Sequence, residues 1–330
     1  MSLIEDPLAV FDVAVVGGGP AGLSAAMWCA RYRRTVLLVD ADEQRNSSAA
    51  ETHGYLGLDG AEPAELVERA ISDVLAYPEV TRIEGGSVTD VTVVDDAFDL
   101  RLEDGRRMRA LRLILATGVV DLLPDIAHFD EYYGATAFTC PTCDGYEAQG
   151  KRVVAIGDDD HISGFALGLL DWAGSVALIA ATDAAGVGQG ETARVEAAGV
   201  EVIRGTPVAL EGAEGALRAV RLADGTRVEC EVVFCTVRNV QHSDLPARLG
   251  CEMSEEGCVI VDPDGRTSVT NVFAAGDMTP GPQLVQIAAA EGARAGIAAA
   301  LSLRGERGAP GSPHPAPEPN EVLSASTHRV

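Results

Sequence analysis

The sequence has few basic residues for its number of acidic ones. Its 330 residues include 25 Lys and Arg against 50 Asp and Glu, which gives a formal net charge of −25 at pH 7. A protein that binds nucleic acid needs a basic face to displace the counterions of the phosphate backbone, and binding to an anionic lipid surface needs one too. We therefore expect neither nucleic acid nor a membrane as a partner.

The sequence also lacks signals for export and for membrane insertion. Its first ten residues, MSLIEDPLAV, contain acids and no basic segment, unlike a secretory signal. The longest apolar stretch, residues 11–30, is interrupted by the glycine-rich sequence GGGPAG, which disfavours a continuous membrane-spanning helix. A hydrophobic fraction of 47% is ample for packed cores, and the length suggests two domains. We expect a soluble, cytoplasmic protein.

Cysteine is too sparse and too scattered for a disulfide framework or a zinc ribbon. Of seven Cys, only Cys140 and Cys143 form a C-x-x-C pair, whereas a zinc ribbon needs two such pairs. A C-x-x-C sequence lowers the pKa of a thiol and forms a reversible disulfide, which predicts a redox centre. Asp144, directly after the inner thiol, is the candidate for proton transfer. We expect Cys29, Cys251 and Cys258 to be buried. Cys230 and Cys235 are five apart on a predicted strand, so we expect them to face opposite ways and not to act together.

The first third of the sequence alternates strand and helix signals. The apolar runs 13–16 and 35–39 predict buried parallel strands, and residues 23–32 between them predict a helix that ends in basic residues. Strand, glycine-rich turn, helix and strand form a βαβ unit with a right-handed crossover. Further predicted elements are a helix at 63–77, an antiparallel hairpin within 88–108 and a buried strand at 111–115.

The same order of elements recurs after residue 150. We predict a strand at 152–156, a helix at 165–172, a strand at 175–179 and a hairpin within 209–228. The strand 272–274 and the helix 283–303 have no counterpart in this second copy, so we expect them to complete the first domain. Residues 305–330 are rich in Pro, Gly and Ser, which predicts a disordered tail. The predicted fold class is α/β, with two dinucleotide-binding, Rossmann-like domains of which the second is inserted in the first.

A glycine-rich turn lies between the first predicted strand and helix. In the pattern G-x-G-x-x-G, Gly17 permits the tight turn, Gly19 lets a pyrophosphate approach the backbone and Gly22 lets the helix pack on the strand. Asp40 closes the next strand, where a carboxylate would bind ribose hydroxyls. Because the helix N-terminus attracts anions, these residues together predict a dinucleotide site.

The corresponding turn of the second domain does not suit a phosphate. It is Gly157-Asp158-Asp159-Asp160-His161, so an Asp stands where a bare backbone is needed and three carboxylates would repel the ligand. No Arg pair that could hold a 2′-phosphate follows residue 179. We expect this domain not to bind NADPH, and we favour a helix start capped by Asp.

Together these motifs resemble the low-molecular-weight thioredoxin reductase family of flavoproteins over nearly the whole chain up to residue 304. The similar segments are GGGPAG with Asp40, Ala116-Thr117-Gly118, the sequence CPTCDG from Cys140, TSVTNVFAAGD at 267–277 and Gln286-Ile287. The resemblance implies FAD as cofactor and a homodimer. It also implies an FAD domain in two pieces, 1–119 and 246–304, with residues 120–245 inserted between them.

The departures from that pattern resemble a branch that lost NADPH and oxidises dithiols, similar to the gliotoxin- and holomycin-pathway dithiol oxidases. This implies that a small natural-product dithiol attacks Cys140 and leaves as an intramolecular disulfide. Cys143 would then pass the electrons to FAD and on to O2, giving H2O2, while Asp144 manages the protons. By analogy Arg45, Asn46 and His53 line the flavin or the substrate cleft. The implied cofactor-binding residues are Gly17, Gly19, Pro20, Ala21, Gly22, Asp40, Arg45, Asn46, His53, Val88, Ala116, Thr117, Gly118, Gly276, Asp277, Gln286 and Ile287.

Two other functions stay open. One is a disulfide reductase that draws electrons from NADPH or from another donor such as reduced ferredoxin, for which bleaching of the flavin by NADPH would be evidence. The other is a flavin-binding redox sensor, for which a stoichiometric partner and negligible turnover would be evidence.

Overall fold

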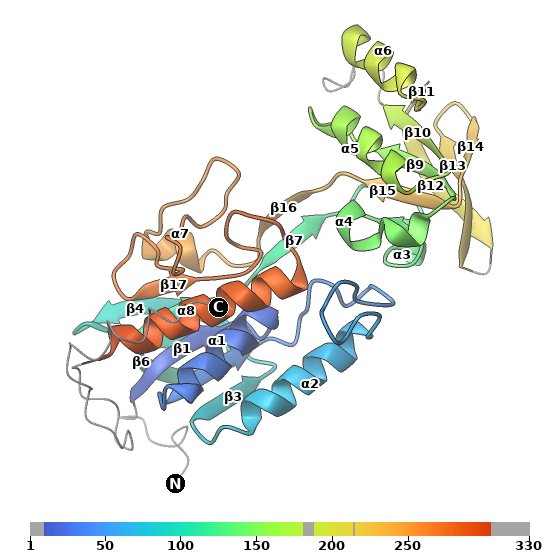
Figure 1. The fold of residues 1–330 in the computed structure, drawn as a ribbon. Helices are drawn as coiled ribbons and strands as arrows, with labels where there is room; N and C mark the ends of the chain where they lie inside the picture. The colour runs from blue at the N-terminus through green and yellow to red at the C-terminus, as the bar shows by residue number, and fades with distance from the viewer. Residues whose placement is uncertain (1–9, 181–187, 214, 305–330) are drawn as a thin grey trace, which may run out of the picture. The chain divides into compact units, whose positions relative to one another are not determined.

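The computed structural model describes residues 10–180, 188–213 and 215–304, and the chain divides into two compact units (Figure 1). The first unit comprises the residues up to 45, 65–119 and those from 241 onward, and the second comprises 46–64 and 120–240. The predicted domain boundaries differ in two stretches, because residues 46–64 group with the second unit and residues 241–245 group with the first. The predicted tail, 305–330, lies outside the described residues.

The first unit is built on a sheet with the strand order β3-β2-β1-β6-β5-β4, in which β17 also pairs with β6. The pairs among β1, β2, β3, β6 and β17 are parallel, and those among β4, β5 and β6 are antiparallel. The elements are β1 (Val10–Val16), α1 (Pro20–Arg31), β2 (Val36–Asp40), α2 (Pro63–Leu75), β3 (Val80–Glu84), β4 (Val88–Val94), β5 (Ala97–Leu102), β6 (Arg107–Leu115), α7 (Leu245–Leu249), β17 (Val272–Ala274) and α8 (Val285–Ser302).

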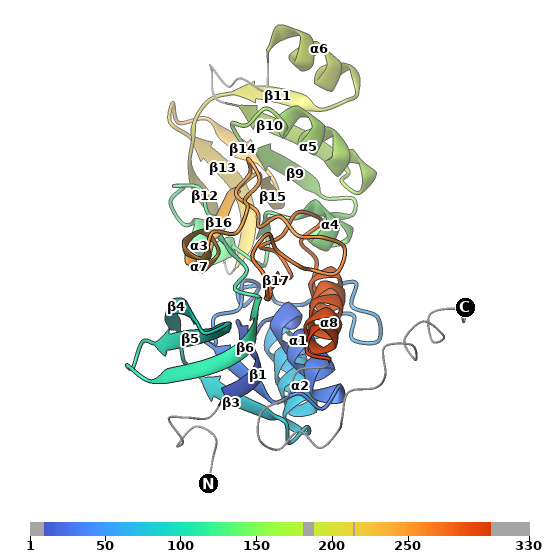
Figure 2. The same cartoon turned by 90° about the vertical axis from the view of Figure 1, so that its left-hand side faces the viewer.

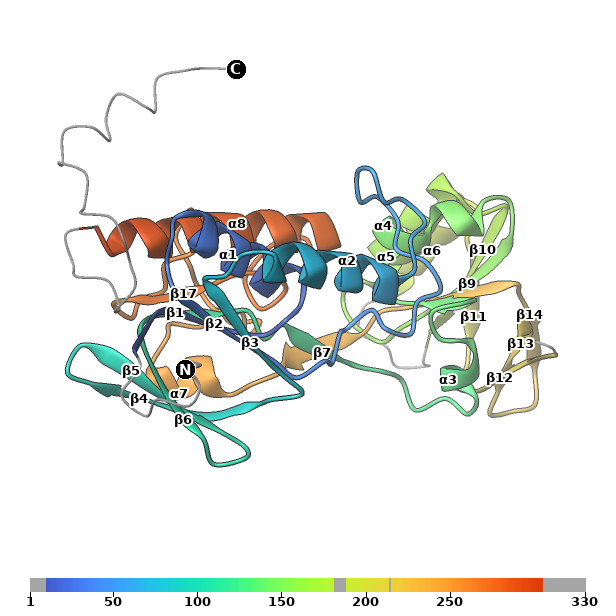
Figure 3. The ribbon, with the colours of Figure 1, turned by 90° about the horizontal axis from the view of Figure 1, so that it is seen from below.

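Alternate residues of β1 are buried on opposite faces of this sheet. Val13 and Val15 of β1 pack with α1 and α8, whereas Ala14 and Val16 pack with Phe98 of β5 and its neighbours. This is the period-2 pattern of a strand that is covered on both sides, and it explains why β1 is apolar throughout. Figures 2 and 3 show α1, α2 and α8 gathered on one side of the sheet.

The second unit contains a parallel sheet with the strand order β11-β10-β9-β15-β8 and a three-stranded antiparallel sheet, β12-β13-β14. Strands β7 and β16 form a separate two-stranded sheet. The elements are β7 (Val119–Leu122), α3 (Phe129–Tyr132), β8 (Ala137–Phe138), α4 (Pro141–Asp144), η1 (Tyr146–Ala148), β9 (Arg152–Ile156), α5 (Ile162–Gly168), η2 (Leu169–Asp171), β10 (Ser175–Ala180), α6 (Gln189–Ala197), β11 (Glu201–Arg204), β12 (Pro207–Ala213), β13 (Ala216–Leu222), β14 (Arg227–Glu229), β15 (Val232–Cys235) and β16 (Arg238–Gln241).

The α/β fold class predicted from the sequence is confirmed, and two elements of the second unit need correction. The helix expected at 165–172 begins earlier, at Ile162, and continues as the 3-10 turn η2. The hairpin expected within 209–228 consists of three strands, with the Asp224-Gly225 turn between β13 and β14. Among the residues that the structure describes, no helix combines the length and the apolar character needed to span a bilayer.

Candidate functional site

The glycine turn between β1 and α1 is tightly packed except at the position where a ligand would approach. A Cβ on Gly17, whose φ is +112°, would lie 2.2 Å from the carbonyl oxygen of Ala116, and one on Gly22 would lie 1.8 Å from that of Gly17. A Cβ on Gly19, by contrast, would meet nothing within 4 Å. Helix α1 begins at Pro20, and no described side chain caps its N-terminus. The turn therefore presents backbone amides and open space, as a pyrophosphate requires.

Asp40 lies directly against this turn, since a Cβ on Gly18 would come within 1.9 Å of its Cγ. The carboxylate is buried and interacts within the chain: Arg82 donates to its Oδ2 from Nη2 at 2.6 Å and from Nε at 3.1 Å. Sequence reasoning missed Arg82. The sequence contains only an indirect signal for this residue: it lies on β3, which pairs with β2, and its partner there is Leu38. Binding of a ribose by Asp40 stays a prediction.

Helix α8 packs so closely on α1 that the two helices lie backbone to backbone (Figure 3). A Cβ on Gly292 would lie 2.0 Å from the carbonyl oxygen of Ala21. The same contact brings Gly276, at φ +83°, against Ala21 at the start of α1. Gln286 and Ile287 lie in the first turn of α8, which contains no acidic residue. The start of α1, the middle of α8 and the Gly276-Asp277 turn thus lie together in the first unit.

Arg45 joins this group through Asp277. Its Nη1 donates to Asp277 Oδ2 at 2.8 Å and to Gln283 Oε1 at 2.8 Å. Two other predicted residues lie differently. Asn46 belongs to the second unit, where its amide donates to Thr52 Oγ1 at 3.4 Å, and the side chain of Val88 packs against the hydrophobic core. The remaining predicted residues follow β6: Ala116 packs on the glycine turn, Thr117 Oγ1 contacts the sulfur of Met278, and Gly118 has φ +67°.

In the second unit, Cys140 and Cys143 form a disulfide at the carboxyl end of β8, the edge strand of the parallel sheet. Cys140 caps the short helix α4, and the backbone N–H of Cys143 donates to its Sγ at 3.1 Å. Both cysteines are half-buried. A hydrogen bond to Sγ favours the thiolate form of Cys140 once the bond is reduced.

Asp144 follows this disulfide and has an unusual acidity. The pKa of its carboxyl is raised from 3.8 to about 6: burial contributes most, the charge of Glu147 adds to the rise, and the charge of His53 opposes it. Gly145 lets the chain turn here, because any Cβ would lie 2.7 Å from the Trp172 ring. A carboxylate with this pKa can accept and return a proton near neutral pH.

His53 lies in this redox region, although its sequence position is close to the glycine-turn half of the chain. Its Nε2 is 3.5 Å from Glu147 Oε1 and 3.6 Å from Glu51 Oε2, and its Nδ1 is 3.9 Å from Asp59 Oδ1. Sequence reasoning placed His53 at the flavin or the substrate cleft and missed Glu147. The only available signal for Glu147 was its spacing of one helical turn from Asp144. Among the described residues, no group of His, Cys, Asp or Glu is arranged to hold a metal ion.

Four of the other five cysteines are buried, among them Cys29 and Cys251 as predicted. Burial raises the pKa of Cys29, Cys230 and Cys235 to about 12 and raises that of Cys251 as well. Cys258 differs from the prediction because it is half-buried rather than buried.

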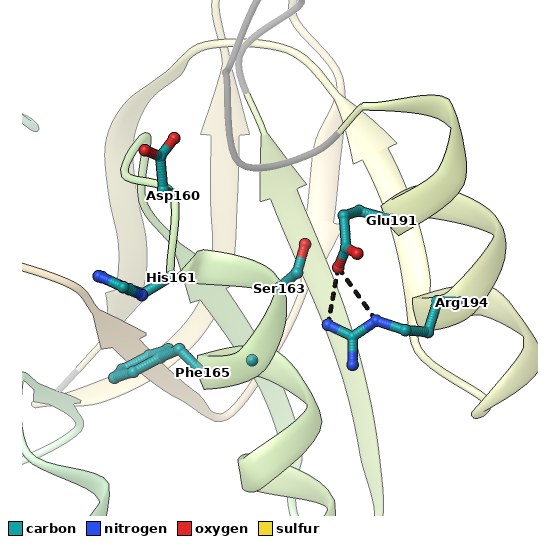
Figure 4. A pocket seen from close by; sticks show the side chains of 7 residues that line it. Asp160, His161, Ser163, Phe165, Glu191 and Arg194 are labelled. Atoms are coloured by element: carbon teal, nitrogen blue, oxygen red, sulfur yellow. Dashed lines mark hydrogen bonds and ion pairs between the residues drawn. The ribbon is translucent and has the colours of Figure 1, made fainter.

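The second dinucleotide-like turn is acidic, but the expectation of a helix start capped by Asp is wrong, because the N-cap residue of α5 is His161 and no described side chain caps this helix. The Asp159 carboxylate accepts the backbone N–H of His161 at 2.7 Å, and helix α5 starts only after it, at Ile162. A cleft of about 460 Å³ beside this turn is lined by Asp160, His161, Ser163, Gly164, Phe165, Glu191 and Arg194 (Figure 4).

A cation that sequence reasoning missed lies in this cleft. Arg194 of α6 donates to Glu191 Oε2 at 2.7 and 3.0 Å, so its charge is paired with a carboxylate (Figure 4). Most of the segment after residue 179, where an Arg pair was sought, lies outside the described residues. The expectation that this domain does not bind NADPH stays a prediction.

Comparison with known proteins places these features in context. Residues 11–292 match the family described as pyridine nucleotide-disulphide oxidoreductase. Thioredoxin reductase tcpT of Claviceps purpurea is 30% identical over 81% of this chain and 86% of its own length. An oxidoreductase structure from Agrobacterium tumefaciens is 36% identical, with a TM-score of 0.82 over 89% of this chain and 98% of its own. The structure of HlmI is 35% identical, with a TM-score of 0.83 over 88% of this chain and 92% of its own.

Proposed function

The chain belongs to the pyridine nucleotide-disulphide oxidoreductases, an FAD-binding family, and has their thioredoxin reductase-like fold, and we propose that it oxidises a small dithiol to an intramolecular disulfide. The Cys140–Cys143 pair would be the oxidant of the substrate, with FAD as cofactor and O2 as final acceptor. One observation carries the proposal: the second unit combines a redox disulfide that is followed by a proton acceptor, Asp144, with a second dinucleotide turn rich in carboxylates.

The first unit fits FAD. Gly19 leaves open space over the start of α1, and the amides there would hold the pyrophosphate. Asp40 would hold the ribose, and Asp277 with the first turn of α8 would hold the flavin half. When bound, FAD would accept the electron pair of the reduced cysteines and deliver it to O2, which yields H2O2.

The cysteine pair exchanges bonds with the substrate in two steps that balance. A substrate thiolate attacks Cys140 Sγ, so a mixed disulfide forms, the Cys140–Cys143 bond breaks and Cys143 leaves as a thiolate. The second substrate thiolate then attacks the substrate sulfur of the mixed disulfide, which closes the product and releases Cys140. The substrate loses two electrons and two protons, and the cysteine pair gains the two electrons.

Asp144 provides the acid–base chemistry of this exchange. A thiol attacks only after it loses its proton, and a carboxyl with a pKa of about 6 is mostly ionised at pH 7 and can accept it. The same carboxyl, once protonated, can return the proton to a leaving thiolate. These roles follow from its position next to Cys143 and from its half-buried state.

The proposal is tested by mixing the FAD-loaded protein with dithiothreitol in air, without any nicotinamide. We expect continuous formation of H2O2, which a Cys140→Ser, Cys143→Ser double variant with normal FAD content abolishes. Absence of peroxide, together with bleaching of the flavin by NADPH under nitrogen, would refute the oxidase and support a disulfide reductase.

The reductase is the second candidate because the relative tcpT has the name thioredoxin reductase and because Arg194 places a cation in the cleft at the second turn. We rank it lower since Glu191 already pairs with that cation. Reduction in a single turnover, followed by stable binding of a protein partner, would instead indicate a redox sensor. We also propose a homodimer, and sedimentation of the FAD-loaded protein tests it.

A further inference from the structure

Backbone contacts anchor the loop that contains His53 to the second unit. The N–H of Ala50 donates to the carbonyl of Gly134 at 3.3 Å, and a Cβ on Gly134 would lie 2.1 Å from the carbonyl oxygen of Ser48. The N–H of Thr52 donates to the carbonyl of Ala61 at 2.8 Å, which closes the loop. Because both ends are fixed, the loop holds the imidazole of His53 with only 23% of its surface exposed.

Glu147 supplies a partly unsatisfied carboxylate next to this imidazole. Its Oε2 is buried and has no hydrogen-bond partner among the described residues, and its Oε1 is 3.5 Å from His53 Nε2. A buried acceptor without a donor is costly, on the order of 1–3 kcal/mol, so the contact between Oε1 and the imidazole matters for this carboxylate.

The same two groups act on Asp144, and they act in opposite directions. The charge of Glu147 disfavours ionisation of Asp144, whereas the charge of His53 favours it. Two more carboxylates, Glu51 and Asp59, face the imidazole. An acid beside the redox disulfide, a second acid and an imidazole thus share one electrostatic environment.

We propose that His53 and Glu147 are positioning residues that set the protonation of Asp144. The inference rests on thiol exchange at Cys140–Cys143, which the proposed function requires. The first substrate proton passes through Asp144 and ends on Cys140, and the second stays on the Asp144 carboxyl while Cys143 remains a thiolate. Two protons and two electrons leave the dithiol, and both are accounted for within the protein.

The test uses the FAD-loaded protein and dithiothreitol under nitrogen, so that it does not depend on O2. Loss of the Cys140–Cys143 disulfide is followed by rapid quenching, alkylation and mass measurement between pH 5.5 and 9. We compare wild type with His53→Gln, Glu147→Gln and Asp144→Asn. The matched control is His128→Gln, which breaks a His–Glu pair of 2.8 Å on the exposed surface of the same unit.

The two positioning variants should move the acidic limb of the rate profile in opposite directions. We expect Glu147→Gln to shift it to lower pH and His53→Gln to shift it to higher pH, each by about half a unit or more. His53→Gln should also be slower at neutral pH and regain rate with added imidazole, while the control matches wild type. In the Asp144→Asn background, neither substitution should change the profile further.

The proposal would be overturned if both variants changed the rate by the same factor at every pH, or if both shifted the acidic limb in the same direction. Either result would indicate a merely structural role. Far-UV circular dichroism and FAD content confirm that each variant is folded. Failure of the proposed oxidase would be visible separately, as absence of H2O2 from wild type in air, because the exchange step is measured without O2.

Discussion

Replacement of Asp144 by Asn should stabilise the protein while it removes the proton acceptor. Burial raises the pKa of this carboxyl from 3.8 to about 6 in the folded state. Folding therefore favours the protonated form, and this contribution is fully present below pH 3.8 and is lost as the pH rises through about 6. A shift of this size corresponds to ~3 kcal/mol, which solvent screening of a half-buried group reduces to ~1–2 kcal/mol. Asn cannot ionise, so the variant keeps this stability at neutral pH.

The assay is urea unfolding between pH 5 and 8, because the sequence isoelectric point of about 4.5 makes lower pH prone to aggregation. The protein has two Trp, so in a Trp28→Phe background the fluorescence of Trp172, which packs against Gly145, reports on the second unit. The gain from Asp144→Asn should be ~1–2 kcal/mol at pH 8 and about half of that at pH 5.

A control of opposite sign accompanies this measurement. The hydrogen bonds from Arg109 lower the pKa of Asp99 in the first unit from 3.8, so its contribution is lost only below the pH range of the assay. Asp99→Asn should therefore lose stability by nearly the same amount at pH 5 and at pH 8. The control is followed by circular dichroism. If Asp144→Asn is destabilising, or if its effect is the same at pH 5 and pH 8, the argument from burial is wrong.

Three further predictions follow from the geometry. Gly22→Ala places a Cβ 1.8 Å from a carbonyl oxygen of the glycine turn, so FAD content after gel filtration should fall at least about tenfold, whereas Gly168→Ala, with nothing within 4 Å, should keep it. The carboxylates around the redox disulfide should make neutral dihydrolipoamide react several-fold faster than anionic dihydrolipoate at low salt, and equal rates at low and high salt would contradict this. In the oxidised protein at pH 8, iodoacetamide should modify Cys258 alone, and prior reduction should add Cys140 and Cys143 by mass spectrometry.

Much of the fold could be predicted from the sequence because local pattern and tertiary environment agree there. Strands buried on both faces are continuous apolar runs, which is why β1, β2 and β17 were found within three residues of their bounds. The start of α5 was missed because Asp159 satisfies the N–H of His161 and leaves Ile162 as the first helical residue, an arrangement that apolar periodicity does not report.

The candidate site could be predicted only where a motif is contiguous. The glycine turn and the cysteine pair are local, and the structure forms both. The His53–Glu147 pair depends on the contact of Ala50 with Gly134, which joins parts of the chain that are far apart in sequence. The partners Arg82 of Asp40 and Glu191 of Arg194 are likewise charges whose pairing is decided by which elements become neighbours.

The direction of electron flow that we propose follows from where the carboxylates lie in the second unit. At the second dinucleotide turn, Asp158 to Asp160 would raise the free energy of a bound phosphate, which disfavours NADPH as the donor. At the redox disulfide, Asp144 provides an acceptor for a proton that a dithiol must release. Carboxylates thus disfavour NADPH as the electron donor at the second turn and favour reduction of the cysteine pair by a dithiol at the disulfide. The Asp144 carboxyl is mostly ionised above a pH of about 6. The rate of dithiol oxidation should therefore rise as the pH increases through that value, whereas the rate of a reductase that donates protons to a disulfide should fall.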